Sequence, residues 1–396
     1  MAGQEFRSVL VILLAVALAG ITGGCDRDSE TDTVFVEVEV PVPIPPEPQG
    51  PTASEIEAEW EGSGHADETA EAFTHWDATG TIPVTCAKCH STHGFRDFVG
   101  DDGSTPGIVD KAAEIGTTVE CDACHNPAAV ALTSVTFPSG QHVPDLGSEA
   151  RCMQCHQGRE STVSLNDHID TVAPADDDTP DADLHFRNVH YFAAGVTLYG
   201  GLALGAYQYE DKIYNGKLVH VADYDTCVEC HNVHTLEVQV DACAECHPGV
   251  RNTSDLRTVR MARSVRDYDG DGDMDEGIYG EVETMTAKLL KAIMDYGADK
   301  LGFPIIYDAH SYPYWFHDTD GDGEVDEGEA SYSNQYSKWT ARLLRAAYNY
   351  QYSQKDPGTY AHNPRYIISI LYDSLDTLHE VDEVTVPEFD KMWRGD

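Results

Sequence analysis

The sequence predicts a mainly α-helical and irregular fold, in which a loop-rich region built around covalent cofactors precedes a small helical bundle with calcium-binding loops. Three observations lead to this prediction. A Cys-x-x-Cys-His motif occurs five times between residues 54 and 250, and these motifs hold ten of the 11 cysteines of the chain. From residue 251 onward there is no cysteine, and a helical period appears. Two acidic, glycine-containing loops occur in that second region.

The composition indicates an acidic folded protein. The 396 residues include 25 Lys+Arg against 69 Asp+Glu, which gives a formal net charge of −44. Apolar residues make up 41% of the chain, enough for a folded core rather than a disordered polymer. So acidic a surface repels nucleic-acid phosphates and anionic lipid headgroups, and therefore argues against DNA, RNA and peripheral membrane binding. It favours cations and basic partner proteins.

The N-terminus is typical of an exported protein. Arg7 precedes an apolar run over residues 9–21, which is too short to span a bilayer and fits a signal peptide. Small residues then lead to Cys25, as in bacterial lipoprotein signals, where the cysteine carries the lipid. We therefore expect a signal peptide over residues 1–24, and a lipidated Cys25 with a proline-rich linker over residues 25–53. Ordinary signal cleavage with an unstructured leader is the alternative.

The five motifs carry the chemistry of the chain. A histidine directly after each cysteine pair is the attachment signature of c-type haem, because two thiols three positions apart can bond both vinyl groups of one porphyrin and the next imidazole can bind its iron. Zinc ribbons also use paired cysteines but do not require that histidine. The sequence therefore predicts five haems c. They are attached at Cys86, Cys89, Cys121, Cys124, Cys152, Cys155, Cys227, Cys230, Cys243 and Cys246, with proximal ligands His90, His125, His156, His231 and His247.

The second axial ligand of each haem decides between electron transfer and catalysis. A haem closed by two strong ligands mainly carries electrons, whereas an open sixth position allows substrate chemistry. The chain has 18 histidines, so that enough remain outside the motifs to close all five haems. The candidates for the distal ligands are His75, His190, His220, His234, His362 and His93.

We expect a haem domain over residues 54–250 and a helical domain over residues 251–396. Because five haems would lie in the first region, their porphyrin faces can supply much of its apolar surface. We therefore expect short helices, many loops and little sheet there. In the second region, residues 286–296 resemble residues 340–350, and an apolar stripe follows helical spacing from Tyr336 to Tyr350. A last helix is expected over residues 365–379, with Pro364 in its first turn.

The acidic loops have the pattern of EF-hand calcium loops, in which carboxylates alternate around a glycine that permits a sharp turn. The loop from Asp318 to Glu329 fits the twelve-residue pattern, with carboxylates at positions 1, 3, 5, 9 and 12 and glycine at position 6. The loop that begins at Asp267 has Ile278 at position 12, so that Glu276 or Glu281 would have to supply the last ligand. One or two Ca²⁺ ions with a structural role are expected. The candidate ligands are Asp318, Asp320, Asp322, Glu324, Asp326 and Glu329 in one loop, and Asp267, Asp269, Asp271, Asp273 and Asp275 in the other.

Together, the motifs and the leader resemble multihaem c-type cytochromes of the bacterial cell envelope. We expect an exported outer-membrane or cell-surface lipoprotein, with a position on the periplasmic face as the alternative. The resemblance implies bis-histidine haems arranged as a conductor, redox partner proteins or extracellular electron acceptors, and membrane attachment through the lipid anchor alone. An oxidoreductase that acts on a small nitrogen or sulfur species at one open haem is the alternative, although no Cys-x-x-Cys-Lys motif is present. Self-assembly into conducting filaments is a third hypothesis.

Overall fold

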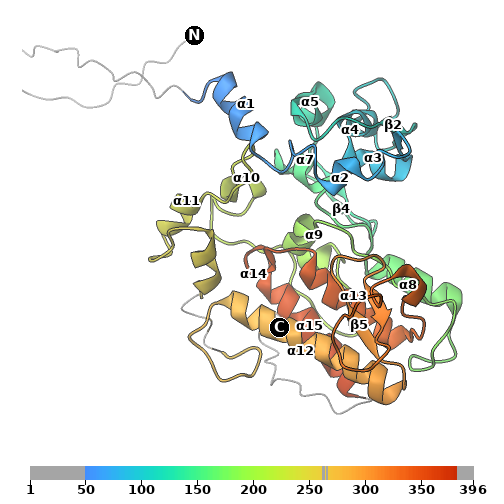
Figure 1. Ribbon diagram of the computed structural model, residues 1–396. Helices are drawn as coiled ribbons and strands as arrows, with labels where there is room; N and C mark the ends of the chain where they lie inside the picture. The colour runs from blue at the N-terminus through green and yellow to red at the C-terminus, as the bar shows by residue number, and fades with distance from the viewer. Residues whose placement is uncertain (1–49, 261–263, 265, 381–396) are drawn as a thin grey trace, which may run out of the picture. The chain divides into compact units, whose positions relative to one another are not determined.

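The structure is a computed structural model that describes residues 50–260, 264 and 266–380 (Figure 1). Its contacts divide the chain into two units, Met1–Ala53 and Ser54–Asp396, and only residues 50–53 of the first are described. The expected signal peptide, Cys25 and the linker as far as residue 49 lie outside the described residues. Among the described helices, none combines the length and the apolar character needed to cross a bilayer.

The motif-bearing region consists of short helices and loops, with two antiparallel strand pairs of two residues per strand. Local capping sets several helix boundaries: the Ser91 side chain accepts from the amide of Gly94, and Asn126 accepts from that of Ala129. The prediction of a helix-rich, sheet-poor fold is confirmed for the described residues. The elements are α1 (Ala53–Glu61), α2 (Glu71–Thr74), β1 (Thr81–Ile82), α3 (Val84–His90), α4 (Thr92–Val99), β2 (Ala113–Glu114), α5 (Cys121–His125), α6 (Pro127–Val130), β3 (Val135–Thr136), β4 (His142–Val143), α7 (Glu149–Met153), α8 (Thr162–Val172), α9 (Ala194–Tyr199), η1 (Gly200–Leu202), α10 (Cys227–Cys230), α11 (Val240–Ala244) and η2 (Thr253–Thr258).

The C-terminal region is built on three longer helices that pack on one another, α12, α13 and α15 (Figure 1). Thr340 caps α13 by accepting from the amide of Leu343, and Asn363 caps α15 by accepting from that of Tyr366. The apolar stripe is buried, although its first two members, Tyr336 and Trp339, precede α13. The elements are α12 (Ile278–Asp295), η3 (Tyr296–Lys300), β5 (Ile305–Tyr307), β6 (Trp315–His317), η4 (Tyr332–Asn334), α13 (Ala341–Gln354), α14 (Thr359–His362) and α15 (Pro364–His379).

The largest side-chain core draws on both sides of residue 250. It runs from Val135 to Leu378 and includes the segment around α9 together with α12, α13 and α15. Buried polar contacts join the same parts, since Asn349 on α13 accepts from the amide of Tyr207 at 2.7 Å and donates to its carbonyl at 3.0 Å. The expected boundary at residue 250 therefore does not separate two units of contacts. The two regions share contacts because the motif-free segment near α9 packs its apolar residues against the helices that follow it.

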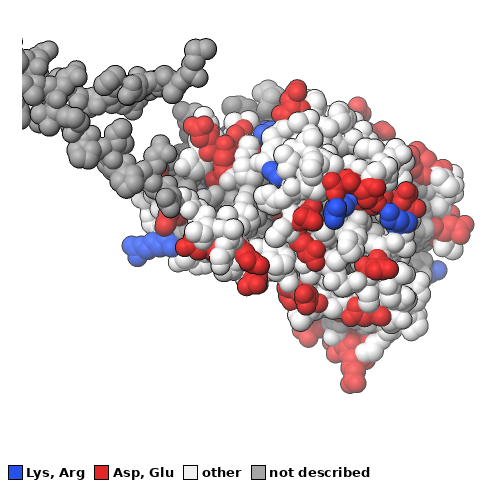
Figure 2. Space-filling view, turned by 90° about the horizontal axis from the view of Figure 1, so that it is seen from above, with Lys and Arg blue, Asp and Glu red and all other residues white. Residues whose placement is uncertain are grey.

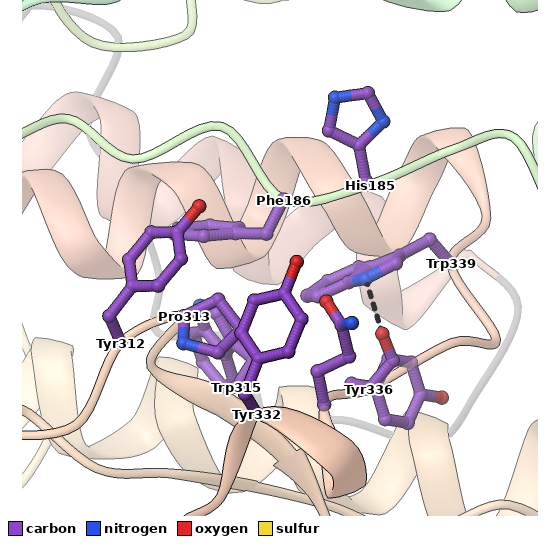
Figure 3. A pocket seen from close by; sticks show the side chains of 9 residues that line it. His185, Phe186, Tyr312, Pro313, Trp315, Tyr332, Tyr336 and Trp339 are labelled. Atoms are coloured by element: carbon purple, nitrogen blue, oxygen red, sulfur yellow. Dashed lines mark hydrogen bonds between the residues drawn. The ribbon is translucent and has the colours of Figure 1, made fainter.

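Two surface features complete the fold. Acidic side chains are spread over the face shown in Figure 2, with few basic ones among them. A small pocket of about 160 Å³ lies in the C-terminal region (Figure 3), where Trp339 donates from its indole nitrogen to the carbonyl of Tyr336. No residue that lines this pocket belongs to a Cys-x-x-Cys-His motif. Its lining is mainly aromatic: His185, Phe186, Tyr312, Pro313, Trp315, Tyr332, Gln335, Tyr336 and Trp339.

Candidate haem sites and cation loops

The five motifs fold as short helical turns that place their reactive side chains together. In the last three motifs the amide of the histidine donates to the carbonyl of the first cysteine, at 3.0 Å for His156 and at 2.9 Å for His231 and His247. One such turn brings residues three positions apart onto one side of the helix, which is the arrangement that two thioether bonds to one porphyrin need. All ten motif cysteines are free of disulfide bonds in the structure.

Each motif histidine faces a second histidine from a distant part of the chain. The five pairs have ring centroids 5.8–6.4 Å apart. In motif order, the pairs are His90 with His190, His125 with His234, His156 with His65, His231 with His362, and His247 with His220.

This spacing fits a metal ion between the two rings of each pair. A metal ion bound at about 2 Å from each of two opposed imidazole nitrogens places the ring centroids roughly 6 Å apart. Burial lowers the pKa of several of these imidazoles, to about 4 for His156 and for His190, so that the neutral metal-binding form prevails at pH 7. His190 also has a φ of 66°, an uncommon backbone conformation for a residue other than glycine. The donor set and its spacing therefore fit haem iron with two axial histidines.

Four of the six predicted distal candidates lie opposite a motif histidine: His190, His220, His234 and His362. The other two do not. The His75 ring is 60% exposed and contacts Trp76 and Glu71, and His93 is exposed on α4. His65, which the sequence reasoning left out, faces His156 instead. Its neighbours in sequence are polar and give no signal, because the pairing depends on a contact across the fold, where the amide of Val119 donates to the carbonyl of His65.

A further pair of histidines has a different geometry. The rings of His168 and His185 lie 4.1 Å apart, and Nε2 of His168 accepts from the amide of His185 at 3.2 Å. The hydrogen bond occupies that ring nitrogen, and the centroids are too close for an interposed metal ion of the kind that fits the five pairs. Neither residue is within a motif.

The third motif contacts the first, second and fourth. Sγ of Cys155 lies 3.9 Å from the carbonyl oxygen of Lys88 in the first motif. Helix α7, which carries Cys152, packs against α10, which carries the first part of the fourth motif. Arg151 donates to the carbonyl of Cys124 in the second motif at 3.0 Å. The motifs are therefore neighbours in space, with the third at the centre of this set.

The acidic loop that begins at Asp318 has the internal hydrogen bonds of a cation-binding turn. The carboxylate of Asp318 accepts from the amides of Gly321 and Gly323, at 2.7 and 2.9 Å. Glu329 accepts from the amide of Thr319 at 2.7 Å, which folds position 12 back onto position 2. Carboxylate oxygens of Asp318, Asp320 and Asp322 come within 4.8 Å of one another.

The loop that begins at Asp267 repeats this arrangement with a different residue at its end. Glu281, from the first turn of α12, accepts from the amide of Tyr268 at 2.7 Å and thus takes the place that Glu329 takes in the other loop. Buried oxygens of Asp269 and Glu276 have no hydrogen-bond donor among the described residues. Burial and the neighbouring Asp269 and Glu281 raise the pKa of Glu276 to about 7. Carboxylates crowded in this way fit a divalent cation bound by oxygen ligands.

Sequence comparisons agree with the geometry. Residues 71–157 match the family described as cytochrome c7 and related cytochrome c. With the five attachment motifs, this match defines the chain as a multihaem c-type cytochrome, which binds haem c covalently.

Similarity to individual proteins extends over most of the chain. It is 26% identical over 381 residues to the C-type polyheme cytochrome OmcB of Geobacter sulfurreducens strain DL-1 / KN400, and 26% identical over 388 residues to OmcC of strain ATCC 51573 / DSM 12127 / PCA. These alignments cover 79% and 80% of this chain but only 46% of each relative, so that the chain spans about half the length of the relatives it matches. No solved structure matches the chain.

Proposed function

We propose that the chain is an electron-transfer cytochrome with five haems c, each closed by two histidines. The observation that carries this proposal is that every motif histidine has a second histidine opposite it, with the ring centroids 5.8–6.4 Å apart. Haem c, when bound, supplies a one-electron iron couple. The two imidazoles of each pair would both bind the iron and so would exclude water and substrate from it. The oxidoreductase alternative needs a motif histidine without a facing partner, and all five have one.

The contacts between motifs support electron exchange along the chain. The third motif contacts the first through Cys155 and Lys88, and its helix α7 packs against α10 of the fourth, so that the haems attached there would be neighbours. The protein therefore keeps the attachment points of the first, third and fourth motifs close to one another.

We further propose that the protein acts in the cell envelope, exported by its signal peptide and anchored through a lipid on Cys25, on the outer membrane or the cell surface. The acidic surface, with a net charge of −44, supports docking to basic redox proteins or to cationic extracellular acceptors through long-range attraction. The same charge disfavours nucleic acid.

Analysis of the purified full-length holoprotein tests the main proposal. We expect an intact mass that contains five haem increments, and an optical redox titration with reversible reduction of all the haem. Carbon monoxide should leave the spectrum of the reduced protein unchanged, because both axial positions are held by histidine. A protein without covalent haem, or reduced haem that readily binds carbon monoxide, would contradict the proposal.

We also propose that the two acidic loops each bind one Ca²⁺ ion with a structural role. The support is the shared arrangement in which Glu329 and Glu281 fold back onto position 2 of their loops. Arg260 lies 2.6 Å from Glu281 and offsets part of the crowded negative charge of the first loop. Calcium would supply the remaining positive charge.

Calorimetric titration of the chelator-treated holoprotein with Ca²⁺ tests this second proposal. We expect two binding events, of which Glu281→Gln removes one and Glu329→Gln removes the other. Glu283→Gln is the matched control, since Glu283 is exposed on the same helix as Glu281 and should leave both events intact. Chelation should lower the melting temperature and leave the haem content unchanged. Absence of binding, or an unaltered titration for Glu281→Gln, would overturn the assignment.

A further inference from the structure

His362 differs from the other paired histidines in its hydrogen-bond partner. It ends α14 and faces His231 of the fourth motif with the ring centroids 6.4 Å apart. Its Nδ1 lies 2.8 and 2.9 Å from the two carboxylate oxygens of Asp356. The Asp356 side chain is 1% exposed. A donated Nδ1–H leaves Nε2 as the nitrogen available to iron.

The remaining contacts of the fourth site hold this arrangement in place. The amide of Gly358 donates to the Asp356 carboxylate at 3.0 Å. A Cβ atom at Gly358 would lie 2.5 Å from the His362 ring, so that only glycine leaves room for the imidazole. Asn363 caps α15 immediately after His362 and donates to the carbonyl of Gly216 at 2.9 Å. The imidazole and its carboxylate are therefore fixed by the turn that joins α13 to α15.

Other paired histidines have Nδ1 contacts that carry less negative charge, or none, within hydrogen-bond distance. His90 and His231 contact backbone carbonyl oxygens, those of Ala72 at 2.8 Å and Leu236 at 3.2 Å. A carboxylate also lies near His234, but Glu59 is 3.9 Å from its Nδ1, beyond hydrogen-bond distance, and is 36% exposed to water. In the described part of the chain, Asp356 is thus the buried carboxylate that hydrogen-bonds to a paired imidazole.

A carboxylate in this position changes the electronic character of the ligand. By accepting a hydrogen bond from Nδ1–H, the carboxylate raises the basicity of the imidazole, which favours the more highly charged ferric iron. Its negative charge acts in a buried, low-dielectric environment, where it stabilises ferric over ferrous iron more than a neutral carbonyl would.

We propose that Asp356 is a positioning residue that lowers the reduction potential of the haem attached at Cys227 and Cys230, by holding His362 through a buried carboxylate–imidazole hydrogen bond. This inference rests on the proposed bis-histidine binding. Because the fourth motif contacts the third, a haem of lowered potential would lie within the row of cofactors rather than at an isolated position.

The test is a redox titration of the full-length holoprotein carrying Asp356→Asn, which keeps the size of the side chain and removes its charge. Mutation of an outer-shell partner of a metal-bound histidine typically costs 10–100-fold in metal affinity or activity. We expect the reduction equilibrium constant of one haem to rise at least tenfold, which is about 59 mV for one electron. Glu59→Gln is the matched control and should move no step. Five unchanged steps in a low-spin Asp356→Asn protein would overturn the proposal.

Spin state separates failure of this inference from failure of the proposed function. A high-spin fraction in the unaltered protein would mean that the bis-histidine assignment itself fails. The Asp356→Asn protein alone becoming partly high spin would mean that this variant does not keep His362 on the iron. The Asp356→Glu protein then tests the role of the charge, since it restores a carboxylate. We then expect a low-spin spectrum with the original potential, and a low-spin Asp356→Glu protein with a raised potential would overturn the role of the charge.

Discussion

Removal of the His65 imidazole tests the histidine pairing at the site that sequence reasoning did not identify. His65 faces His156 with the ring centroids 6.1 Å apart, and burial lowers the pKa of His65, which keeps its ring neutral at pH 7. His65→Gly removes one of ten paired imidazoles. We therefore expect one haem in five to lose an axial ligand, so that about a fifth of the ferric iron becomes high spin.

The assay is electron paramagnetic resonance of the oxidised holoprotein, with the high-spin signal quantified against total haem. Added imidazole should return the His65→Gly protein to a fully low-spin spectrum, because the free ligand replaces the missing ring. His75→Gly is the matched control, since the exposed ring of His75 faces no motif histidine. A high-spin fraction in His75→Gly with none in His65→Gly would refute the pairing.

Two further predictions concern stability. Leu371 is fully buried in the core that α15 shares with α12 and α13, so that Leu371→Ala should lower the free energy of unfolding by about 2–5 kcal/mol in chemical denaturation. Leu202→Ala, at a position 59% exposed, should change it by less than about 0.5 kcal/mol, and equal effects would contradict the packing. Lys355 is 1% exposed with its ammonium over the rings of Tyr191 and Tyr314, and burial lowers its pKa to about 8. Between pH 8 and the ordinary lysine pKa of about 10.5, the folded state then binds fewer protons than the unfolded state. The free energy of unfolding of the unaltered protein, relative to that of Lys355→Met, should therefore rise across this window, by at most about 1.4 kcal/mol per pH unit. A difference that stays constant or falls with pH would show that the ammonium is not buried as described.

The chemistry of the chain was accessible from sequence because haem attachment is a local pattern. Two cysteines and a histidine within five residues define the site without any knowledge of the fold, and the multihaem class they predict is confirmed by the family match at residues 71–157. The last helix could also be predicted from local sequence, since Pro364 marks its start and an apolar period follows. Observed α15 begins within one residue of the expected position.

Features that depend on tertiary contacts were not accessible in the same way. His65 has polar neighbours, and only the fold brings it to His156, some ninety positions later in the sequence. Glu281 was recognised as one of two substitutes for a missing loop ligand, but its hydrogen bonds to the loop amides required the structure. The change of composition at residue 251 suggested a domain boundary, whereas the helices that follow share a core with the segment around α9 because that segment buries its own apolar residues against them.

The central claim is that each of five covalent haems is closed by two histidines. Spin quantification of the oxidised, unaltered holoprotein, referred to its covalent haem content, tests this claim most directly. The pairing predicts five haems per chain, all of them low spin. Fewer than five haems, or a high-spin signal amounting to one haem or more per chain, would contradict it.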